Sequence, residues 1–295
     1  MQTDADVYRT APIELVDAGD ATLACRRFGA GPTLLLVHGF PLHGFTWRHV
    51  LPTLAQRFTC IVVDLPGFGD ATWSAATDFG FHAHARRLRT VLDRLGVASC
   101  HVLAQDTGAT IARCLALQAP ERVTSLALVN TEMPGHRPPW IREFQWALRL
   151  PAAGRFFQAL LRSDRYIRSG MGFGGCFADP RLLGGDFHDA FVAPLVASSR
   201  RIDGLSRYLL GLGWDVVDAM AQRHAELRMP VLLVWGEDDP TFPLPLARAM
   251  ADQFPAGEGI AVIPHTRLLP HEERPDDVCA HVVPFLERTM ARAAS

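Results

Sequence analysis

An aspartate stands in the stretch HVLAQDTGATIA (101–112) at a place where a carboxylate could attack an electrophilic carbon. Asp106 ends an apolar run, and Thr107 and Gly108 open a helical pattern. A tight turn between a buried strand and a helix exposes its side chain, and the helix N-terminus favours negative charge beside it. Ala104 and Gly108 are small enough for such a crowded turn. Asp106 is therefore a candidate nucleophile, and the competing interpretation is a simple helix cap.

The elements that would position Asp106 alternate between short apolar runs and longer amphipathic segments. Because strands that are buried on both faces alternate here with helices, the pattern predicts a mostly parallel sheet with helices on both sides. A more alternating segment, 21–28, is expected to form an antiparallel edge hairpin with 13–17. The expected buried strands lie at 33–39, 60–69, 100–105, 123–130, 229–239 and 259–264, and two of the expected helices at 82–97 and 108–123.

The alternation stops between about 134 and 228, in a region rich in aromatic residues and arginine. We predict a core formed by 1–133 and 228–295 and a helical cap formed by 134–227. Ligands of open α/β sheets bind at the carboxyl ends of the strands. The cap is therefore expected to cover the active site.

Composition narrows the function classes. The 295 residues carry a net charge of −2 without charged blocks, so neither nucleic acid nor a membrane is an expected partner. All 29 basic residues are arginine, which excludes a Schiff-base lysine. Six scattered cysteines and a polar N-terminus predict a reduced, cytoplasmic protein. The sequence contains no phosphate-binding loop and no cysteine–histidine spacing typical of zinc sites, so no cofactor and no metal is expected. Whether the chain forms a homodimer is left open.

Four further segments resemble one known family. The chain resembles the α/β-hydrolases, and within them the branch of epoxide hydrolases and haloalkane or haloacetate dehalogenases, which carry an elbow aspartate. The resemblance covers roughly 12–133 and 228–290 and implies a mostly parallel, eight-stranded sheet with helices on both faces and a helical cap. The segments are LLLVHGFPLHGFTW (34–47), DLPGFGDAT (64–72), LLVWGEDDPTFP (232–243) and LPHEERPDDVCAHVVPFL (269–286).

The resemblance implies a role for several residues. Asp106 would attack an electrophilic carbon and form an alkyl-enzyme ester. The backbone N–H groups of Phe40 and Thr107 would stabilise the later tetrahedral intermediate as an oxyanion hole. The loop beside them would be shaped by His38, which is expected to orient backbone rather than transfer protons, and by Gly39 and Pro41.

The chain departs from the family at the catalytic histidine. Asp239 stands where the family places the acid that orients this histidine, and Asn130, at an alternative acid position, cannot supply charge. Counting from the flanking prolines in either direction, the histidine's position holds Leu268, with His265 and His271 on either side. Without the histidine, general-base help worth roughly 10²–10⁴-fold is missing.

Three hypotheses follow from Leu268. His271 or His265 could reach the site through an altered loop, and the chain would be an ordinary epoxide hydrolase or a dehalogenase. Asp106 could instead act in a dry pocket, on an epoxide or similar strained electrophile, in a ring opening or cyclisation that needs no water. The third hypothesis is a catalytically silent binding protein.

The cap should supply the donors that hold a leaving oxygen or halide. The resemblance places Tyr208 at the second donor position and Gln145 and Trp146 at the first, although both aromatic residues could simply pack within the cap. The arginines that bind a haloacid carboxylate in relatives are replaced by Thr107 and Thr110. We therefore expect a neutral, mostly apolar small molecule as substrate.

Overall fold

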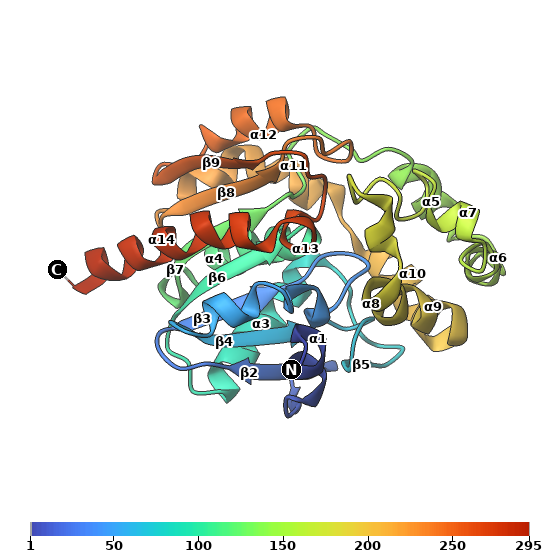
Figure 1. The fold of residues 1–295 in the computed structure, drawn as a ribbon, viewed down its shortest axis with the longest axis horizontal. Helices are drawn as coiled ribbons and strands as arrows, with labels where there is room; N and C mark the ends of the chain where they lie inside the picture. The colour runs from blue at the N-terminus through green and yellow to red at the C-terminus, as the bar shows by residue number, and fades with distance from the viewer. Residues whose placement is uncertain (1, 295) are drawn as a thin grey trace.

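A nine-stranded sheet runs through the computed structural model, which describes residues 2–294 (Figure 1). Eight strands follow one path in the order β1-β2-β4-β3-β6-β7-β8-β9, and β5 pairs with β2 beside it. Pairs from β4 to β9 along this path are parallel, whereas β2 pairs antiparallel with β1, β4 and β5. The strands are β1 (Glu14–Asp17), β2 (Ala21–Phe28), β3 (Thr33–Val37), β4 (Thr59–Asp64), β5 (Thr72–Trp73), β6 (Cys100–Gln105), β7 (Val123–Val129), β8 (Val231–Gly236) and β9 (Gly257–Ile263).

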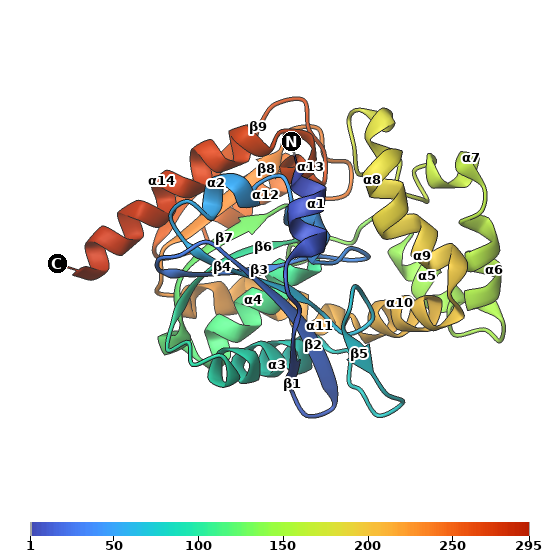
Figure 2. The same cartoon turned by 60° about the horizontal axis from the view of Figure 1, so that its bottom comes forward.

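The expected mostly parallel sheet and its edge hairpin are confirmed. The short strand β5 was not predicted, because its two residues do not form an apolar run and pair only with β2. All residues of β6 and β8 are buried, as continuous apolar runs in a covered sheet require. Helices α3 (Phe81–Arg94) and α4 (Thr107–Gln118) cover one face, and α14 (Pro275–Ala294) crosses the other (Figures 1 and 2).

The remaining helices of the core are short. Near the N-terminus lie α1 (Asp4–Thr10), α2 (Leu51–Leu54) and the 3-10 turn Gly44–Trp47, and a further 3-10 turn, Pro120–Arg122, leads into β7. After β8 come α12 (Leu244–Ala251) and α13 (Pro270–Glu273). No helix within residues 2–294 is long and apolar enough to cross a membrane.

Between β7 and β8 the chain forms helices and turns and no strand. We call residues 134–227 of this stretch the cap. Most of its helices lie beyond one end of the sheet in both views, farthest out α5, α6 and α7 (Figures 1 and 2). They are α5 (Ile141–Ala147), α6 (Ala153–Leu160), α7 (Asp164–Ile167), α8 (Gly185–Phe187), α9 (Ala193–Ala197), α10 (Ser199–Gly211) and α11 (Trp214–Arg223), with a π-helical turn (His188–Val192) and 3-10 turns (Pro180–Leu183, His224–Glu226).

Candidate active site

Asp106 lies on a strained turn between β6 and α4. Its backbone φ is 52°, in the left-handed region that non-glycine residues rarely adopt. The turn is crowded, because a Cβ atom added to Gly108 would lie 2.3 Å from the carbonyl oxygen of His38. A Cβ on Gly39 would lie 2.4 Å from that of Asp106. Glycine at both positions lets the two loops meet, and the arrangement is that of a nucleophile elbow.

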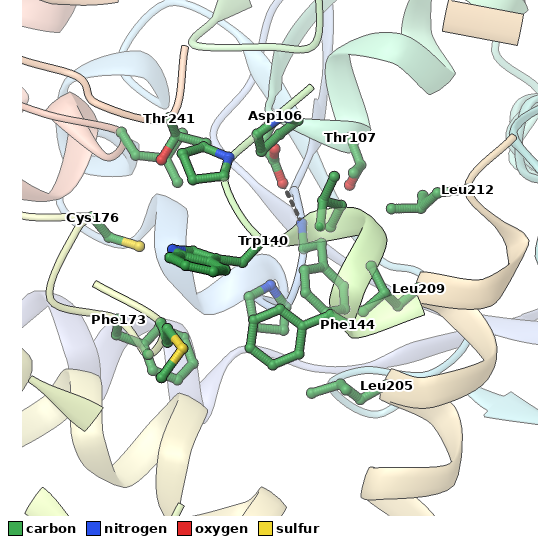
Figure 3. Close-up of a pocket in the computed structure, with 18 of the residues that line it drawn as sticks. Asp106, Thr107, Trp140, Phe144, Phe173, Cys176, Leu205, Leu209, Leu212 and Thr241 are labelled. Carbon is green, nitrogen blue, oxygen red and sulfur yellow. Dashed lines mark hydrogen bonds between the residues drawn. The ribbon is translucent and has the colours of Figure 1, made fainter. Parts of the chain in front are cut away.

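The sheet register explains why these loops meet. Strands β3 and β6 are parallel neighbours in which Val37 pairs with Ala104, so the loops that follow them begin side by side. The N–H of Phe40 donates to Oδ2 of Asp106 at 2.7 Å (Figure 3). The N–H of Thr107 also bonds the Asp106 carboxyl. Both expected oxyanion-hole donors therefore bond the carboxyl of Asp106.

His38 holds the loop that follows β3 through two hydrogen bonds. The N–H of Leu65 donates to its Nε2 at 2.9 Å, so its other ring nitrogen, Nδ1, donates to the carbonyl oxygen of Gly39 at 2.9 Å. Burial lowers the pKa of His38 to about 4, and the ring is neutral at pH 7. This placement matches the expectation that His38 orients backbone, with Pro41 beyond it in the cavity wall.

A cavity of about 190 Å³ lies between Asp106 and the cap (Figure 3). Most of its wall is aliphatic or aromatic and comes from the cap, including Phe144, Phe173, Leu205 and Leu209. Its polar side chains are few, and within residues 2–294 no arginine and no histidine lines it. They are Asp106, Thr107, Glu132, Cys176, Thr241 and the indoles of Trp140 and Trp214.

Glu132 is a second buried carboxyl in this cavity, and the sequence analysis did not single it out. It lies three residues beyond the end of β7 and is 2 % exposed. The Thr110 hydroxyl donates to its Oε2 at 2.6 Å, and the buried guanidinium of Arg113 donates to its backbone oxygen at 2.9 Å. Its position just past a central parallel strand was the available signal, because such strand ends meet at the active site.

The two carboxyls perturb each other. Burial and then the negative charge of Glu132 raise the pKa of Asp106 well above its usual value, against the opposing effect of the N–H groups of Thr107 and Phe40. Burial also raises the pKa of Glu132, while the Thr110 hydroxyl and Arg113 lower it. Burial and mutual repulsion therefore disfavour the state in which both carboxyls are charged.

Asp239 lies behind the cavity wall. The Asn130 amide donates to its Oδ2 at 2.6 Å, and the N–H of Thr241 donates to its Oδ1 at 2.8 Å. Burial raises the pKa of Asp239 to about 6. The acid thus occupies the expected turn after β8, but its side-chain partners are the Asn130 amide and Thr241 rather than an imidazole.

With this geometry in view, comparison with known proteins assigns the family. Residues 32–273 match the sequence profile of the family described as alpha/beta hydrolase fold. The chain belongs to that family. Among curated relatives, it is 30 % identical over 232 residues to a haloalkane dehalogenase of Mesorhizobium japonicum, covering 74 % of this chain and 73 % of that one. It is 26 % identical over 273 residues to a pimeloyl-[acyl-carrier protein] methyl ester esterase of Aeromonas hydrophila, covering 89 % and 99 %.

Solved structures of this family superpose closely. A putative lipase of Acinetobacter baumannii has a TM-score of 0.82 at 20 % identity, over 98 % of this chain and 95 % of that one. The epoxide hydrolase CorEH has a TM-score of 0.77 at 20 % identity, over 94 % and 99 %. At these identities the likeness shows the shared fold.

The structure does not bring a replacement histidine to Asp106. Leu268 lines the cavity, as the counting predicts. His271 instead lies fully buried against Trp47, its Nε2 donating to the Thr46 hydroxyl at 2.8 Å, and burial lowers its pKa to about 3. His265 is exposed and lies outside the cavity wall. The hypothesis of a displaced histidine is therefore wrong for this conformation, because helix α13 directs His271 into the core.

The expected cap donors also lie elsewhere. Gln145 donates to the carbonyl oxygens of Leu209 and Leu212, and its own carbonyl accepts from the Trp214 indole at 2.9 Å. Trp146 is 64 % exposed and points away from the cavity. The prediction that Gln145 and Trp146 face the substrate is therefore wrong, because the inner face of α5 turns Ile141 and Phe144 toward the cavity instead.

Tyr208 lies close to the site without lining the cavity. Its hydroxyl is 3.0 Å from that of Thr107, and its ring packs against Phe40, Phe68 and His84. Burial raises its pKa above the usual value, so it is a neutral phenol that braces the first turn of α4. The expectation that it contacts a leaving group is not met. The sequence analysis did not single out Trp140, whose indole lines the cavity and whose side chain is 55 % exposed.

One cluster has the ligand types of a metal site. Glu237, Asp238 and His265 place their ligand atoms within 4.8 Å of one another on the surface. All three are exposed and none lines the cavity, so we assign the cluster no part in the chemistry.

Proposed function

We propose that this α/β-hydrolase acts through Asp106 on an epoxide or a similar strained electrophile in a neutral, mostly apolar small molecule. The observation that carries this proposal is the pair of buried carboxyls, Asp106 and Glu132, in an apolar cavity whose described wall contains no histidine. The reaction that this pair supports is a ring opening with internal cyclisation, in which no water is consumed.

The surroundings of the two carboxyls favour different protonation states. Glu132 accepts a bond from the Thr110 hydroxyl and lies near the charge of Arg113, and both stabilise its anion. The pKa of Asp106 is raised by burial and by that anion. Two carboxyls whose environments separate their pKa values divide the roles of acid and base. Asp106 is then the proton donor and Glu132 the acceptor.

The step balances within one substrate molecule. The epoxide oxygen takes the proton of Asp106 as its C–O bond breaks. A hydroxyl of the same molecule forms the new C–O bond and gives its proton to Glu132. The product is an isomer of the substrate, and one proton returns from Glu132 to Asp106 before the next turnover. Hydrolysis would require a base that activates water, the role that histidine has in this family.

The cavity wall supports the substrate class. Its aromatic and aliphatic side chains bind apolar surface, and the described wall offers no cation that could bind a substrate carboxylate.

The cysteines are all unpaired, which supports our further proposal of a reducing, cytoplasmic setting.

Dehalogenation is the second candidate, and the similarity to a haloalkane dehalogenase favours it. Halide release needs N–H donors opposite the nucleophile. Trp140 could donate one, whereas the Trp214 indole is occupied by Gln145. The geometry therefore supports the epoxide better. A binding protein without turnover is the third candidate.

The decisive experiment offers the enzyme apolar epoxides with an internal hydroxyl group, and matched haloalkanes, in water labelled with heavy oxygen. We expect cyclic isomers without the label, and loss of at least about 10²-fold in rate for Asp106→Asn and for Glu132→Gln. Thr241→Val, a change in the same cavity wall, is the control and should keep most of the activity. A labelled diol, halide release or no turnover would each overturn the proposal.

A further inference from the structure

The outward face of the cap exposes large apolar side chains. Trp146 on α5 is 64 % exposed, Leu150 after it 49 %, and Phe156 on α6 68 %. Soluble proteins rarely expose several such residues close together in the chain, and where they do the patch commonly binds something. These helices are also the part of the molecule farthest from the sheet (Figures 1 and 2).

The same stretch is strongly basic. Residues 134–175 contain seven arginines and two acidic residues, Glu143 and Asp164, a net charge of +5 in a chain whose total is −2. Arg137 pairs with Asp218 and Arg168 with Asp164. The other five arginines are exposed and form no salt bridge with the described part of the chain. They are Arg142, Arg149, Arg155, Arg162 and Arg165.

Exposed arginines and exposed apolar residues alternate along α5, the turn after it and α6. Arg142 and Trp146 are one helical turn apart on α5, and Arg149 and Leu150 lie in the turn that follows the end of this helix at Ala147. Arg155 and Phe156 are neighbours on the exposed side of α6. We call these six residues the cap face. A surface that alternates arginine with aromatic and aliphatic side chains is typical of helices that lie in a lipid interface.

The cap face lies directly outside the cavity. Helix α5 turns Phe144 inward to the cavity wall and Trp146 outward to solvent, so one helix separates the two sides. The cavity rim continues the apolar surface, because Trp140 and Met171 line the cavity and remain 55 % and 49 % exposed. An apolar molecule that leaves a lipid layer under this face would meet the rim first.

We propose that the cap face docks on an anionic lipid surface and that the substrate enters the cavity from there. A second copy is a poor occupant, because a two-fold interface would bring two faces of the same positive charge together. Anionic headgroups match the arginines, and the acyl region matches Trp146 and Phe156. The net charge of −2, from which no membrane partner is expected, is a sum over the whole chain and does not show this local excess of positive charge.

The test is sedimentation of the full chain with vesicles of phosphatidylglycerol and phosphatidylcholine, compared with phosphatidylcholine alone. Each arginine near an anionic surface raises partitioning about fivefold, so Arg149→Gln with Arg155→Gln should weaken binding about 25-fold. Trp146→Gln with Phe156→Gln should also weaken it. The control is Leu246→Gln with Arg248→Gln, an apolar residue and an arginine that are both exposed on α12, outside the cap face, and whose replacement should leave binding unchanged.

A second measurement does not depend on variants. Binding of the unaltered chain to anionic vesicles should fall steeply as salt rises and the charges are screened. The proposal is overturned if the chain ignores anionic vesicles, binds neutral ones equally well, or responds to the control as to the cap-face variants. It is also overturned if the cap-face substitutions dissociate a homodimer, or release an acidic protein, while vesicle binding is absent. None of these outcomes depends on the reaction that the cavity performs.

Discussion

Replacing Leu268 by histidine should create a hydrolytic activity in this cavity if the proposed reaction without water is correct. Leu268 is 7 % exposed and lines the cavity, so an imidazole at this position would face the substrate. Asp239 is the acid that would orient it. Its carboxyl is held in the turn after β8 by bonds from the Asn130 amide at 2.6 Å and the N–H of Thr241 at 2.8 Å, and by the N–H of Phe242 and the Thr241 side chain, so an imidazole at position 268 would compete with these donors for it.

The expected magnitude follows from general-base catalysis. A positioned base speeds water attack by roughly 10²–10⁴-fold. Removing the buried leucine costs about 1.5–3 kcal/mol of burial free energy, which lowers the melting temperature of a chain this size by roughly 5 °C. The pKa of Asp239 is raised to about 6. Below that pH Asp239 is protonated and orients the ring poorly, so the gained activity should be present above pH 6 and lost as the pH falls through it.

The assay follows diol formation from an apolar epoxide in water labelled with heavy oxygen. Leu268→Gln is the matched control, since it replaces the leucine with a polar side chain that is no base. Leu268→His combined with Asp239→Asn should return the rate close to that of the control. The reasoning would be refuted by a folded Leu268→His variant that hydrolyses no faster than Leu268→Gln, or by an unaltered enzyme that already hydrolyses at the variant's rate.

Three further predictions concern the scaffold. Gly108→Ala should abolish activity, since its Cβ would lie 2.3 Å from the His38 carbonyl oxygen, whereas Gly170→Ala, with open space around it, should retain activity in the same assay. His271→Ala should lower the free energy of unfolding by about 2–4 kcal/mol and leave turnover per folded molecule unchanged. A 10²-fold loss of turnover would instead support the hypothesis that His271 is the displaced catalytic base. Finally, the free energy of unfolding, measured in urea, should fall as the pH drops from 6.5 towards 3. Burial lowers the pKa of His38 to about 4 and those of His224 and His271 to about 3, and it also lowers the pKa of His43, His84 and His101, so the unfolded chain takes up these six protons first. The raised pKa values of Asp106, Glu132, Asp239 and Glu273 oppose this effect, but these four carboxyls are fewer than the six histidines. A rise in stability on acidification would contradict the prediction.

Local patterns in the sequence determined the sheet and the elbow. Apolar runs such as TLLLV and CHVLAQ make strands because a covered sheet must be apolar on both faces. Gly39 and Gly108 make the elbow possible because no larger residue fits where the two loops cross. These are properties of short segments and of the backbone, so residue order alone predicts them. The place of Leu268 was expected on other grounds, from the family resemblance and the spacing at which that family places its catalytic histidine.

The tertiary structure decided which side chains share the cavity. Gln145 and Trp146 lie beside Phe144 in sequence, yet the rotation of α5 sends only Phe144 inward. His271 is three residues from Leu268, yet α13 points it into the core. Glu132 joins Asp106 because β6 and β7 are neighbours, and its pKa depends on Thr110 and Arg113, which come from α4. The direction of a side chain depends on how its whole helix is packed, and a buried charge depends on partners distant in the chain, so neither can be read from local sequence.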